Sequence, residues 1–450
     1  MNQAVVVVQS ARWVAARVLE RVASEGAYAS RALDAELSRA KLEPRDAGLA
    51  TEIVYGALRV LPALDAAIAA HVTQDPQRMD GFARAALRSA AYQLAHLGRL
   101  PAHAIVDETV SIVRAKRGAR VAGFVNAVLR KLASARVASP EPPRALVVPQ
   151  PIAELLVASL GAARAEQFLE QRSLPPPLCL RVEQGERAAL RARIQETLPD
   201  AELQDCLLSP FGLALRRAGA PRSLPGYREG LFSVQEEGSQ LVGLAVGARP
   251  GERIADVCAG HGGKTTLFAR QVGEAGSVLA IDRDERKLEQ IAPELTRLGL
   301  PRERVSSQAL DLTVGLGGLR ANFDRVLVDA PCSGLGTMHR RPELLVRVGA
   351  SDPERLARLQ LAILQRASGL VRSGGTLAYA VCSPSAAEGG GVARAFEAEC
   401  SEFERVREAQ ADGVPPPDAD GVTRIGPWLV PAGSIACPDG YQIVLWRRSR

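Results

Sequence analysis

The chain has 450 residues, of which 47% are hydrophobic and 24% are charged, a balance typical of globular rather than disordered proteins. At roughly 150 residues per domain, this length predicts about three domains. No stretch approaches the roughly 18 consecutive apolar residues that a membrane helix needs. The apolar run 4–8 is short and has no basic residue before it, so we expect a cytoplasmic protein that does not associate with membranes.

Cysteine, histidine and net charge narrow the class of protein further. The seven cysteines are an odd number without a Cys-x-x-Cys pair, which favours reduced thiols over a disulfide framework. The five histidines show no ligand spacing, so no metal site is predicted. A net charge of +6 is compatible with a polyanionic partner but also with ordinary surface charge. Local clustering of basic residues is needed to distinguish a polyanionic partner from ordinary surface charge.

The N-terminal part, residues 1–138, is predicted to be an all-helical domain. Ser10 can cap a first helix in which Val14, Val18 and Val22 recur at helical spacing. No alternating strand pattern occurs in this part. Further helices are predicted over residues 47–60, 62–72, 82–97, 104–114 and 122–132.

Basic residues concentrate at the end of this helical part. Residues 114–136 contain seven of them and no acid: Arg114, Lys116, Arg117, Arg120, Arg130, Lys131 and Arg136. A solvated helix face usually mixes both signs, so this stretch favours a phosphate-binding surface, with a solvated face as the alternative.

A proline-rich stretch, residues 139–144, predicts a linker. The next part, residues 150–245, mixes short helical patterns with short apolar runs at 178–182 and 211–215. This pattern predicts a small α+β domain.

Strand and helix patterns alternate in residues 246–450, which predicts a doubly wound α/β sheet of the Rossmann-like type. The C-terminal run 441–446 can add one more strand. The helices are expected over 264–271 and 285–298, and the strands over 253–257, 277–281, 304–309, 325–328 and 376–381.

A glycine-rich loop, Asp256–Thr265, lies between the first of these strands and its helix, where glycines let the backbone approach a ligand closely. It is not a P-loop, because Cys258 occupies the position of the required first glycine. The spacing also differs from the dinucleotide pattern G-x-G-x-x-G. Asp282 ends the second strand, where a carboxylate can bind ribose hydroxyls. A nucleoside cofactor without pyrophosphate, S-adenosylmethionine, fits better than NAD.

Two cysteines follow neighbouring strands at the same sheet edge. Cys332 lies in Asp329-Ala-Pro-Cys-Ser-Gly334, and Cys382 lies in Val381-Cys-Ser383. A single free cysteine is usually a small buried hydrophobe, but two at adjacent strand ends favour thiol chemistry. The remaining cysteines lack such a setting and are interpreted as structural, namely Cys179, Cys206, Cys400 and Cys437.

A thiolate beside a methyl donor has a chemical rationale on a pyrimidine. Carbon 5 is a poor nucleophile until a thiolate adds at carbon 6 and makes carbon 5 enamine-like. A carboxyl group such as Asp329 could then bond the ring-nitrogen edge of the base. The basic residues 339–341 and Arg347 could hold substrate phosphate, with a solvated face equally favoured.

At these residues the sequence resembles the Nop/Sun family of RNA cytosine-C5 methyltransferases, and within it the ribosomal small-subunit methyltransferase B type. The resemblance covers nearly the whole chain, and residues 1–138 are similar to a NusB-type RNA-binding domain. The motifs are the loop 256–265, the box 329–334, Asn126–Arg130, Ser233–Gln235, Asp439–Tyr441, and the NusB-type segments 55–59, 92–94 and 101–103.

The resemblance implies an enzyme that methylates a cytosine of 16S ribosomal RNA with S-adenosylmethionine and without a metal; we expect a monomer. Cys382 corresponds to the covalent nucleophile and Cys332 to the cysteine that assists product release, with Asp329 beside them in the catalytic set. The cofactor pocket corresponds to Cys258, Ala259, Gly260, His261, Gly262, Gly263, Lys264, Asp282, Asp311 and Asp329.

Several positions depart from the family's usual residues. Gly260-His261 replaces Ala-Pro, His339 replaces the first arginine of a pair, and Glu183 replaces an asparagine, which would place an acid near the RNA. Val381 replaces a threonine, and Gly389 replaces the asparagine of a Glu-Asn pair. These departures motivate an alternative, a catalytically weakened RNA-binding ribosome-assembly factor. A third alternative is a nucleoside-cofactor enzyme acting on DNA or protein.

Overall fold

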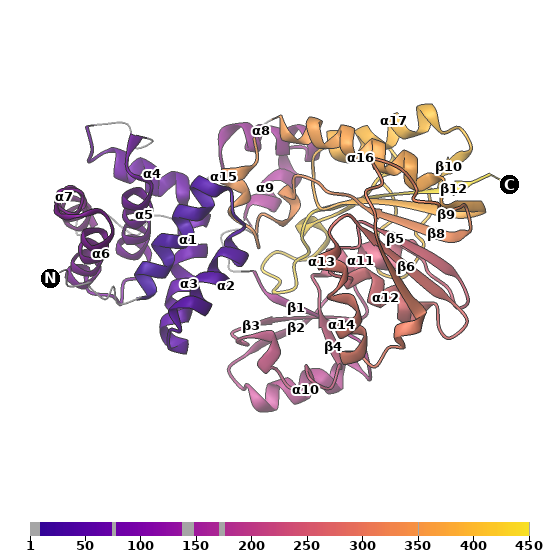
Figure 1. The fold of residues 1–450 in the computed structure, drawn as a ribbon, viewed down its shortest axis with the longest axis horizontal. Coiled ribbons are helices and arrows are strands. Elements are labelled where there is room, and N and C mark those ends of the chain that lie inside the picture. The colour runs from indigo at the N-terminus through magenta and orange to yellow at the C-terminus, as the bar shows by residue number, and fades with distance from the viewer. Residues whose placement is uncertain (1–9, 74–77, 137–147, 171–175, 350, 450) are drawn as a thin grey trace. The chain divides into compact units, whose positions relative to one another are not determined.

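The computed structural model describes residues 10–73, 78–136, 148–170, 176–349 and 351–449 (Figure 1). The predicted linker, residues 139–144, lies outside these ranges. The chain forms two compact units, which are Met1–Ala153 with Arg340–Gly349, and Glu154–His339 with Ala350–Arg450. No helix within the described ranges is long and apolar enough to cross a membrane.

The first unit is helical in its described part, as the sequence predicted. Its helices pack around one continuous apolar core that includes Ile53, Phe82 and Leu129. The helices are α1 (Ala11–Glu25), α2 (Ala29–Ala40), α3 (Pro44–Arg59), α4 (Leu61–Ala69), α5 (Gly81–His96), α6 (Ala102–Arg117), α7 (Ala119–Arg136) and α15 (Leu344–Arg347).

Local sequence signals explain where α1 begins and ends. The Ser10 side chain accepts a hydrogen bond from the main-chain N–H of Trp13, as expected of an N-cap, and Gly26 ends the helix with a φ of 61°. The helix α2 was not predicted from the sequence. Its buried face consists of Ala29, Ala32, Leu33 and Glu36, which is too poor in large apolar residues to reveal the helical period.

In the second unit, a small antiparallel sheet follows α8 (Gln150–Leu160) and α9 (Ala162–Glu170). Its strand order is β2-β3-β1-β4, and α10 (Arg187–Thr197) joins β1 to β2. This arrangement confirms the predicted α+β character of this part of the chain. The strands are β1 (Leu178–Val182), β2 (Glu202–Asp205), β3 (Gly212–Arg216) and β4 (Phe232–Val234).

The rest of the second unit contains a larger sheet whose described strands follow the order β10-β12-β9-β8-β5-β6-β7, with β11 paired to β12. Strands β5 to β9 are parallel, and β12 runs antiparallel beside β9. The strands are β5 (Arg253–Val257), β6 (Ser277–Asp282), β7 (Val305–Ala309), β8 (Phe323–Asp329), β9 (Val371–Val381), β10 (Phe403–Arg405), β11 (Thr423–Ile425) and β12 (Tyr441–Arg448). The short strands β10 and β11 were not predicted.

Helices cover both faces of this sheet, as the doubly wound prediction requires (Figure 1). One face packs against α11 (Glu237–Val246), α12 (Gly263–Gln271) and α14 (Ile291–Arg297), and the other against α16 (Asp352–Ser368) and α17 (Val392–Glu399). The predicted helix 285–298 is wrong as a single element. It divides into α13 (Glu285–Leu288) and α14, because Pro293 cannot continue a helix from the preceding turn.

The strand order places the candidate loops together. β5 pairs with β6 on one side and with β8 on the other, so the order reverses at β5. Ligands of open α/β sheets bind at the carboxyl ends of the strands beside such a reversal. The register pairs Asp329 with Ala380, which brings the ends of β8 and β9 to the same level.

Candidate functional site

The glycine-rich loop connects β5 to α12 in a conformation that ordinary residues rarely adopt. Gly260 and Gly262 have φ values of 58° and 80°, and Cys258 is a non-glycine residue at 63°. A Cβ atom at Gly262 would come within 2.7 Å of the Ile291 side chain. Backbone strain of this kind is concentrated at ligand-binding and active sites.

Asp282, at the end of β6, ties this loop to the neighbouring strand. Its Oδ2 accepts a hydrogen bond from the Gly260 N–H at 3.0 Å, and its Oδ1 accepts one from the Asp284 N–H at 2.9 Å. Lys287 Nζ lies 3.6 Å from the same carboxylate. Asp282 therefore holds the loop in place and also lines a cavity.

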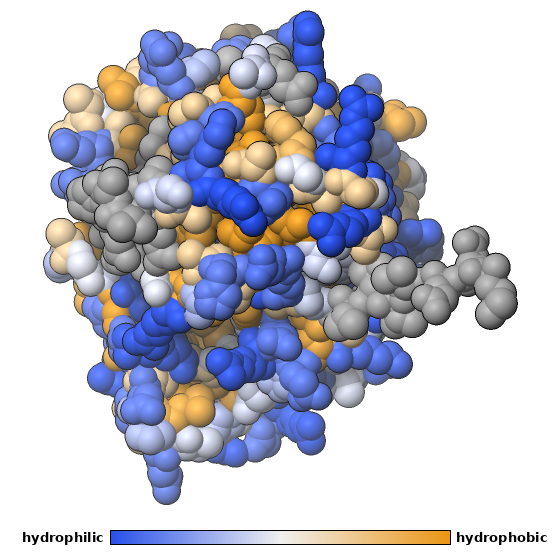
Figure 2. Space-filling view, turned by 90° about the vertical axis from the view of Figure 1, so that its left-hand side faces the viewer, coloured by the Kyte–Doolittle hydropathy of each residue, from blue (hydrophilic) through white to orange (hydrophobic). Residues whose placement is uncertain are grey.

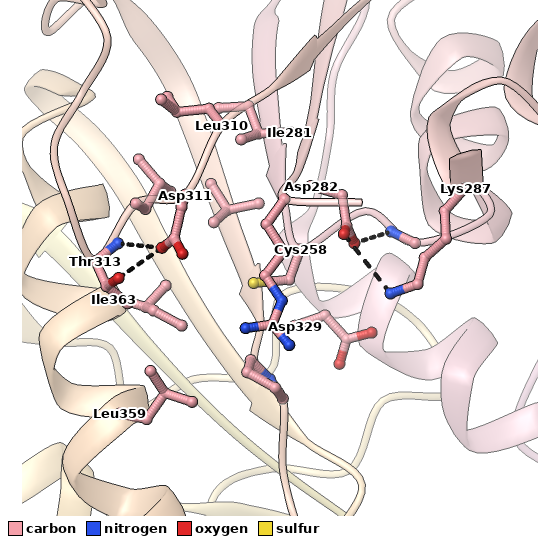
Figure 3. A pocket seen from close by; sticks show the side chains of 15 residues that line it. Cys258, Ile281, Asp282, Lys287, Leu310, Asp311, Thr313, Asp329, Leu359 and Ile363 are labelled. Atoms are coloured by element: carbon pink, nitrogen blue, oxygen red, sulfur yellow. Dashed lines mark hydrogen bonds and ion pairs between the residues drawn. The ribbon is translucent and has the colours of Figure 1, made fainter. Parts of the chain in front are cut away.

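That cavity has a volume of about 230 Å³ and opens beside the loop. Figure 3 shows Asp282 with Lys287 on one side, and Asp311 with Thr313 on the other. Asp311 accepts hydrogen bonds from the N–H and Oγ1 of Thr313, at 2.9 and 2.6 Å, so its carboxylate closes its own turn. Apolar lining comes from Val257, Ile281, Leu310, Leu312, Pro331, Leu359 and Ile363.

Not every predicted cofactor residue lines this cavity. Cys258, Gly260, Asp282, Asp311 and Asp329 do. The others lie elsewhere on the loop or at the start of α12, and Lys264 pairs with Asp329. These others are Ala259, His261, Gly262, Gly263 and Lys264.

Asp256 is a buried acid beneath the loop. Its Oδ2 accepts a hydrogen bond from Thr265 Oγ1 at 2.6 Å, whereas its Oδ1 has no hydrogen-bond partner in the described part of the chain. Burial raises the pKa of Asp256 to about 7. The base of the loop therefore contains a carboxyl group that is only half satisfied.

Lys264 and Asp329 form an ion pair between the glycine-rich loop and the loop that contains Cys332, with Nζ and Oδ2 2.6 Å apart. Burial alone would lower the pKa of Lys264, but the Asp329 carboxylate raises it and keeps the amine charged. The structure thus holds Asp329 at the boundary between the cavity and the cysteines.

The two predicted cysteines lie together. Cys332 Sγ and Cys382 Sγ are 3.2 Å apart, within sulfur hydrogen-bonding distance. Their mutual hydrogen bond and burial raise the pKa of Cys332, which therefore stays a thiol and can donate to Cys382. The sheet register accounts for this approach, since Ala330 N–H also bonds Ala380 O at 2.9 Å.

A fully buried carboxylate that sequence analysis did not assign holds both cysteine loops. Glu388 Oε1 accepts hydrogen bonds from the Ser333 N–H at 2.7 Å and from Gln360 Nε2 at 3.0 Å. Its Oε2 accepts from Ser333 Oγ at 2.5 Å and Ser383 Oγ at 2.6 Å. Each serine directly follows one of the cysteines, and this Cys-Ser repetition was the available signal for a shared partner.

Glu388 lies in a single π-helical turn, Ala387–Gly391. Such turns occur frequently at functional sites. A Cβ atom at Gly389 would lie only 1.9 Å from Gln442 Oε1. Gln442 occupies this space and donates from Nε2 to the carbonyls of Ser383 and Ser385, both at 2.8 Å. The departure at Gly389 is therefore matched by a side chain from β12 that supports the Cys382 loop.

The prediction that Glu183 faces RNA is wrong. The side chain is 1% exposed and pairs with Arg181 and Arg270. Arg181 in turn donates from Nη1 to Gly263 O at 2.7 Å and from Nη2 to Thr266 Oγ1 at 2.9 Å. This acid therefore belongs to a buried network that connects β1 to the start of α12, where charges require partners.

The basic stretch 114–136 is largely exposed. Arg117 is the exception, since it pairs with Glu20 at 3.1 Å and with Asp80 at 2.8 Å. Within the described ranges the other described side chains of the stretch form no ion pair. These side chains are Arg114, Lys116, Arg120, Arg130 and Lys131. Figure 2 views the side where α6 and α7 lie in Figure 1 and shows hydrophilic residues interspersed with apolar ones.

The remaining cysteines have structural surroundings. Cys179, Cys206 and Cys437 are buried, and Cys400 is partly buried. A hydrogen bond to Cys179 and burial raise the pKa of Cys206. Among the described residues, no group of three or more histidines, cysteines or acids could hold a metal ion.

Comparison with known proteins agrees with both halves of this picture. Residues 244–413 match the family model described as 16S rRNA methyltransferase RsmB/F, and residues 9–134 match the NusB family. The protein named "Probable ribosomal RNA small subunit methyltransferase B" of Bacillus subtilis is 31% identical over 88% of this chain and 90% of its own length. The ribosomal RNA small subunit methyltransferase B of Pseudomonas syringae pv. tomato is 33% identical over 90% of each chain.

A solved structure shares the fold over almost the whole length. The crystal structure of PH0851 superposes with a TM-score of 0.81 at 22% identity, and the match covers 97% of this chain and 99% of that one. Together with the two family models, this match confirms the predicted combination of a helical domain, a small α+β part and an α/β methyltransferase domain.

Proposed function

The chain belongs to the ribosomal RNA small subunit methyltransferase B family, and from that premise we propose that it methylates carbon 5 of a cytosine in 16S ribosomal RNA with S-adenosylmethionine. The observation that supports this chemistry best is the 3.2 Å approach of Cys332 and Cys382 beside the cavity. We propose residues 1–138 as the NusB-like RNA-binding domain, 150–245 as the RNA-binding or linker domain, and 246–450 as the catalytic domain.

In this proposal Cys382 is the nucleophile. Its thiol first gives its proton to water; the thiolate sulfur then forms a bond to carbon 6 of the cytosine, and the electron pair of the 5,6 double bond makes carbon 5 reactive. The Cys332 thiol can stabilise the attacking sulfur by donating a hydrogen bond. S-adenosylmethionine, when bound, supplies the methyl group that carbon 5 takes.

Cys332 then acts in product release. The hydrogen bond to Cys382 and burial raise its pKa, and the contribution of that hydrogen bond weakens once the Cys382 sulfur is bonded to carbon. Cys332 then gives its own proton to water and takes the proton from carbon 5. The electrons of that C–H bond restore the double bond and expel the Cys382 thiolate, which completes the balance of atoms and charge.

Asp329 is placed to bind the ring-nitrogen edge of the base, where charge develops during the addition. Lys264 Nζ holds one of its oxygens at 2.6 Å and supplies a compensating charge. In this proposal, Lys264 is therefore a positioning residue and not the direct cofactor ligand suggested by the resemblance.

The cavity residues fit a cationic nucleoside. Asp282 lies at the rim, where it can accept hydrogen bonds from ribose hydroxyls, and apolar side chains such as Leu310 and Ile363 can contact a purine ring. The acids Asp311 and Asp329 suit a ligand that carries positive charge. S-adenosylmethionine is therefore supported by the three acids and the apolar lining of the cavity, and not by the glycine spacing alone.

Bisulfite sequencing of 16S RNA from a strain lacking the protein tests the proposal. One protected cytosine should become convertible, and wild-type protein, but not Cys382→Ala protein, should restore its protection. An unchanged pattern of protected cytosines in the deletion strain would contradict the proposed substrate.

The alternative of a catalytically weakened assembly factor rested on departures near Cys382. Gln442 fills the space above Gly389 and bonds the main chain after Cys382, so this departure has a structural counterpart. Glu388, both cysteines and the Lys264–Asp329 pair remain in a bonded arrangement, which favours an active enzyme.

A further inference from the structure

An exposed aromatic ring in the helical unit is surrounded by guanidinium groups. Tyr28 precedes α2 and is 39% exposed. The guanidinium carbon of Arg347 lies 3.9 Å from the ring centroid, and those of Arg31 and Arg341 lie 5.8 and 5.9 Å away. Residues from two distant parts of the chain therefore build one small surface.

The segment Arg340–Gly349 is anchored in this unit by a buried acid. Glu343 is 1% exposed, and its Oε1 accepts a hydrogen bond from the Ala29 N–H at 3.4 Å. Leu344 and Leu345 of the same segment are also buried. The anchor lies next to Tyr28 in sequence, so it fixes Arg341 and Arg347 beside the ring.

The positive charge of this surface is mostly uncompensated. Within the described residues, Arg31, Arg341 and Arg347 form no ion pair, and Arg347 Nη1 has no hydrogen-bond partner. Glu343 is the acid that Arg341 and Arg347 face, and it is buried. By contrast, Arg21 and Arg39 of the neighbouring helices both pair with Glu36.

Free guanidinium groups around an accessible aromatic ring fit a single-stranded nucleic acid. Guanidinium groups bind phosphates through paired hydrogen bonds, and aromatic rings stack with unpaired bases. We propose that Tyr28, Arg31 and Arg341 form a binding platform for a single-stranded segment of the substrate RNA, with a base on Tyr28 and phosphates on the arginines. This inference rests on the proposed function, because it takes RNA as the substrate.

Arg341 and Arg347 belong to the segment that follows the Cys332 loop along the chain, after Leu335–Thr337. Arg347, stacked on the ring, would keep Tyr28 oriented.

Binding of fluorescent RNA to the full-length protein tests the platform without any methylation readout. Tyr28→Ala should weaken binding of a single-stranded 16S fragment by about five- to tenfold, as expected for one lost base stack, while Tyr28→Phe should retain it. Arg31→Ala/Arg341→Ala should reduce the slope of log affinity against log salt by about 1.4, since two phosphate contacts are lost.

The matched control is Arg45→Ala/Arg99→Ala, which removes two exposed arginines elsewhere in the helical unit. If the platform variants lost no more RNA affinity than the control, or none at all, the platform would be overturned. If they lost affinity only for double-stranded RNA, the proposal that the platform binds a single strand would be overturned. Unaltered melting temperatures of Arg31→Ala/Arg341→Ala and Tyr28→Phe exclude misfolding.

The proposed function and the platform can fail separately. Wild-type protein that binds RNA through Tyr28 but leaves every cytosine unmethylated would contradict the function alone. Methylation that persists with RNA affinity unchanged in Tyr28→Ala would contradict the platform alone.

Discussion

The cofactor loop and the two cysteine loops lie at the same sheet edge but are held in different ways. The cofactor loop depends on its own glycines and on Asp282 from the next strand. The cysteine loops depend on Glu388, whose two oxygens accept four hydrogen bonds. A loop of the first kind can be recognised from local sequence, whereas one of the second kind requires the fold.

The largest effect is expected at the cysteines, which should not behave alike. Cys382→Ala should abolish methyl transfer and any covalent adduct, because no sulfur can add to carbon 6. Cys332→Ala should allow attack but stall release, so a protein–RNA adduct should accumulate. Denaturing gels after incubation with RNA and S-adenosylmethionine measure both outcomes.

Cys400→Ala is the matched control, because Cys400 is a partly buried free cysteine outside both loops. An adduct that persists in Cys382→Ala and disappears in Cys332→Ala would reverse the two roles. Wild-type methylation without an adduct in either variant would contradict the covalent mechanism.

Glu388→Gln should disturb the two cysteine loops and leave the glycine-rich loop unchanged. The amide keeps the size of the side chain but replaces one acceptor oxygen by a donor, so the contacts to Ser333 and Ser383 rearrange. We expect methylation to slow by about 10- to 100-fold, as misplaced catalytic groups do, with affinity for S-adenosylmethionine unchanged.

The same substitution should slow adduct formation in Cys332→Ala protein, which reports the attack step directly. Glu397→Gln makes the matched change at a carboxylate that pairs with Arg405, and it should leave the attack rate unchanged. Equal rates in both variants would remove Glu388 as a positioning residue.

The sequence predicted the strands around the glycine-rich loop and the two cysteines, but not the residues that support the cysteine loops. β5 was predicted within its observed bounds, and Asp282 was identified as the end of the next strand. Glu388 and Gln442 could not be assigned, because their partners lie on other elements. Pro293 was a visible signal for the break between α13 and α14 that the helical periodicity concealed.

The buried acid Asp256 should make the folding stability of the protein depend on pH. Burial raises its folded pKa to about 7, against about 3.9 in an unfolded chain. The folded chain therefore binds more protons between these values, and stability falls as pH rises from about 4 to 7. Asp256→Asn should reduce this decline by about 2–4 kcal/mol.

Urea unfolding of wild-type and Asp256→Asn protein at several pH values measures the difference between the two declines. Asp46→Asn, at an exposed position in α3, is the control for the loss of one carboxylate. Parallel pH profiles for wild-type and Asp256→Asn protein would show that Asp256 ionises as it does in the unfolded chain.

The smallest effects distinguish Asp282 from Asp311 at the rim of the cavity. Asp282→Ala should weaken S-adenosylmethionine binding by about 1–3 kcal/mol, because a charged acceptor for the ribose is lost together with the bond to Gly260. Asp282→Asn retains an oxygen acceptor and should lose less. Asp311→Ala should lose still less, because both hydrogen bonds to this carboxylate come from Thr313 in its own turn.

Calorimetric titration of the three variants ranks these losses. The expected order follows from the geometry, since Asp282 holds the loop and faces the cavity, whereas Asp311 mainly closes a turn. Unchanged affinity in Asp282→Ala would remove this residue from the cofactor site. A larger loss in Asp311→Ala would mean that the ligand breaks the turn and takes the Asp311 carboxylate as its main acceptor, so the cofactor would bind on the opposite side of the cavity.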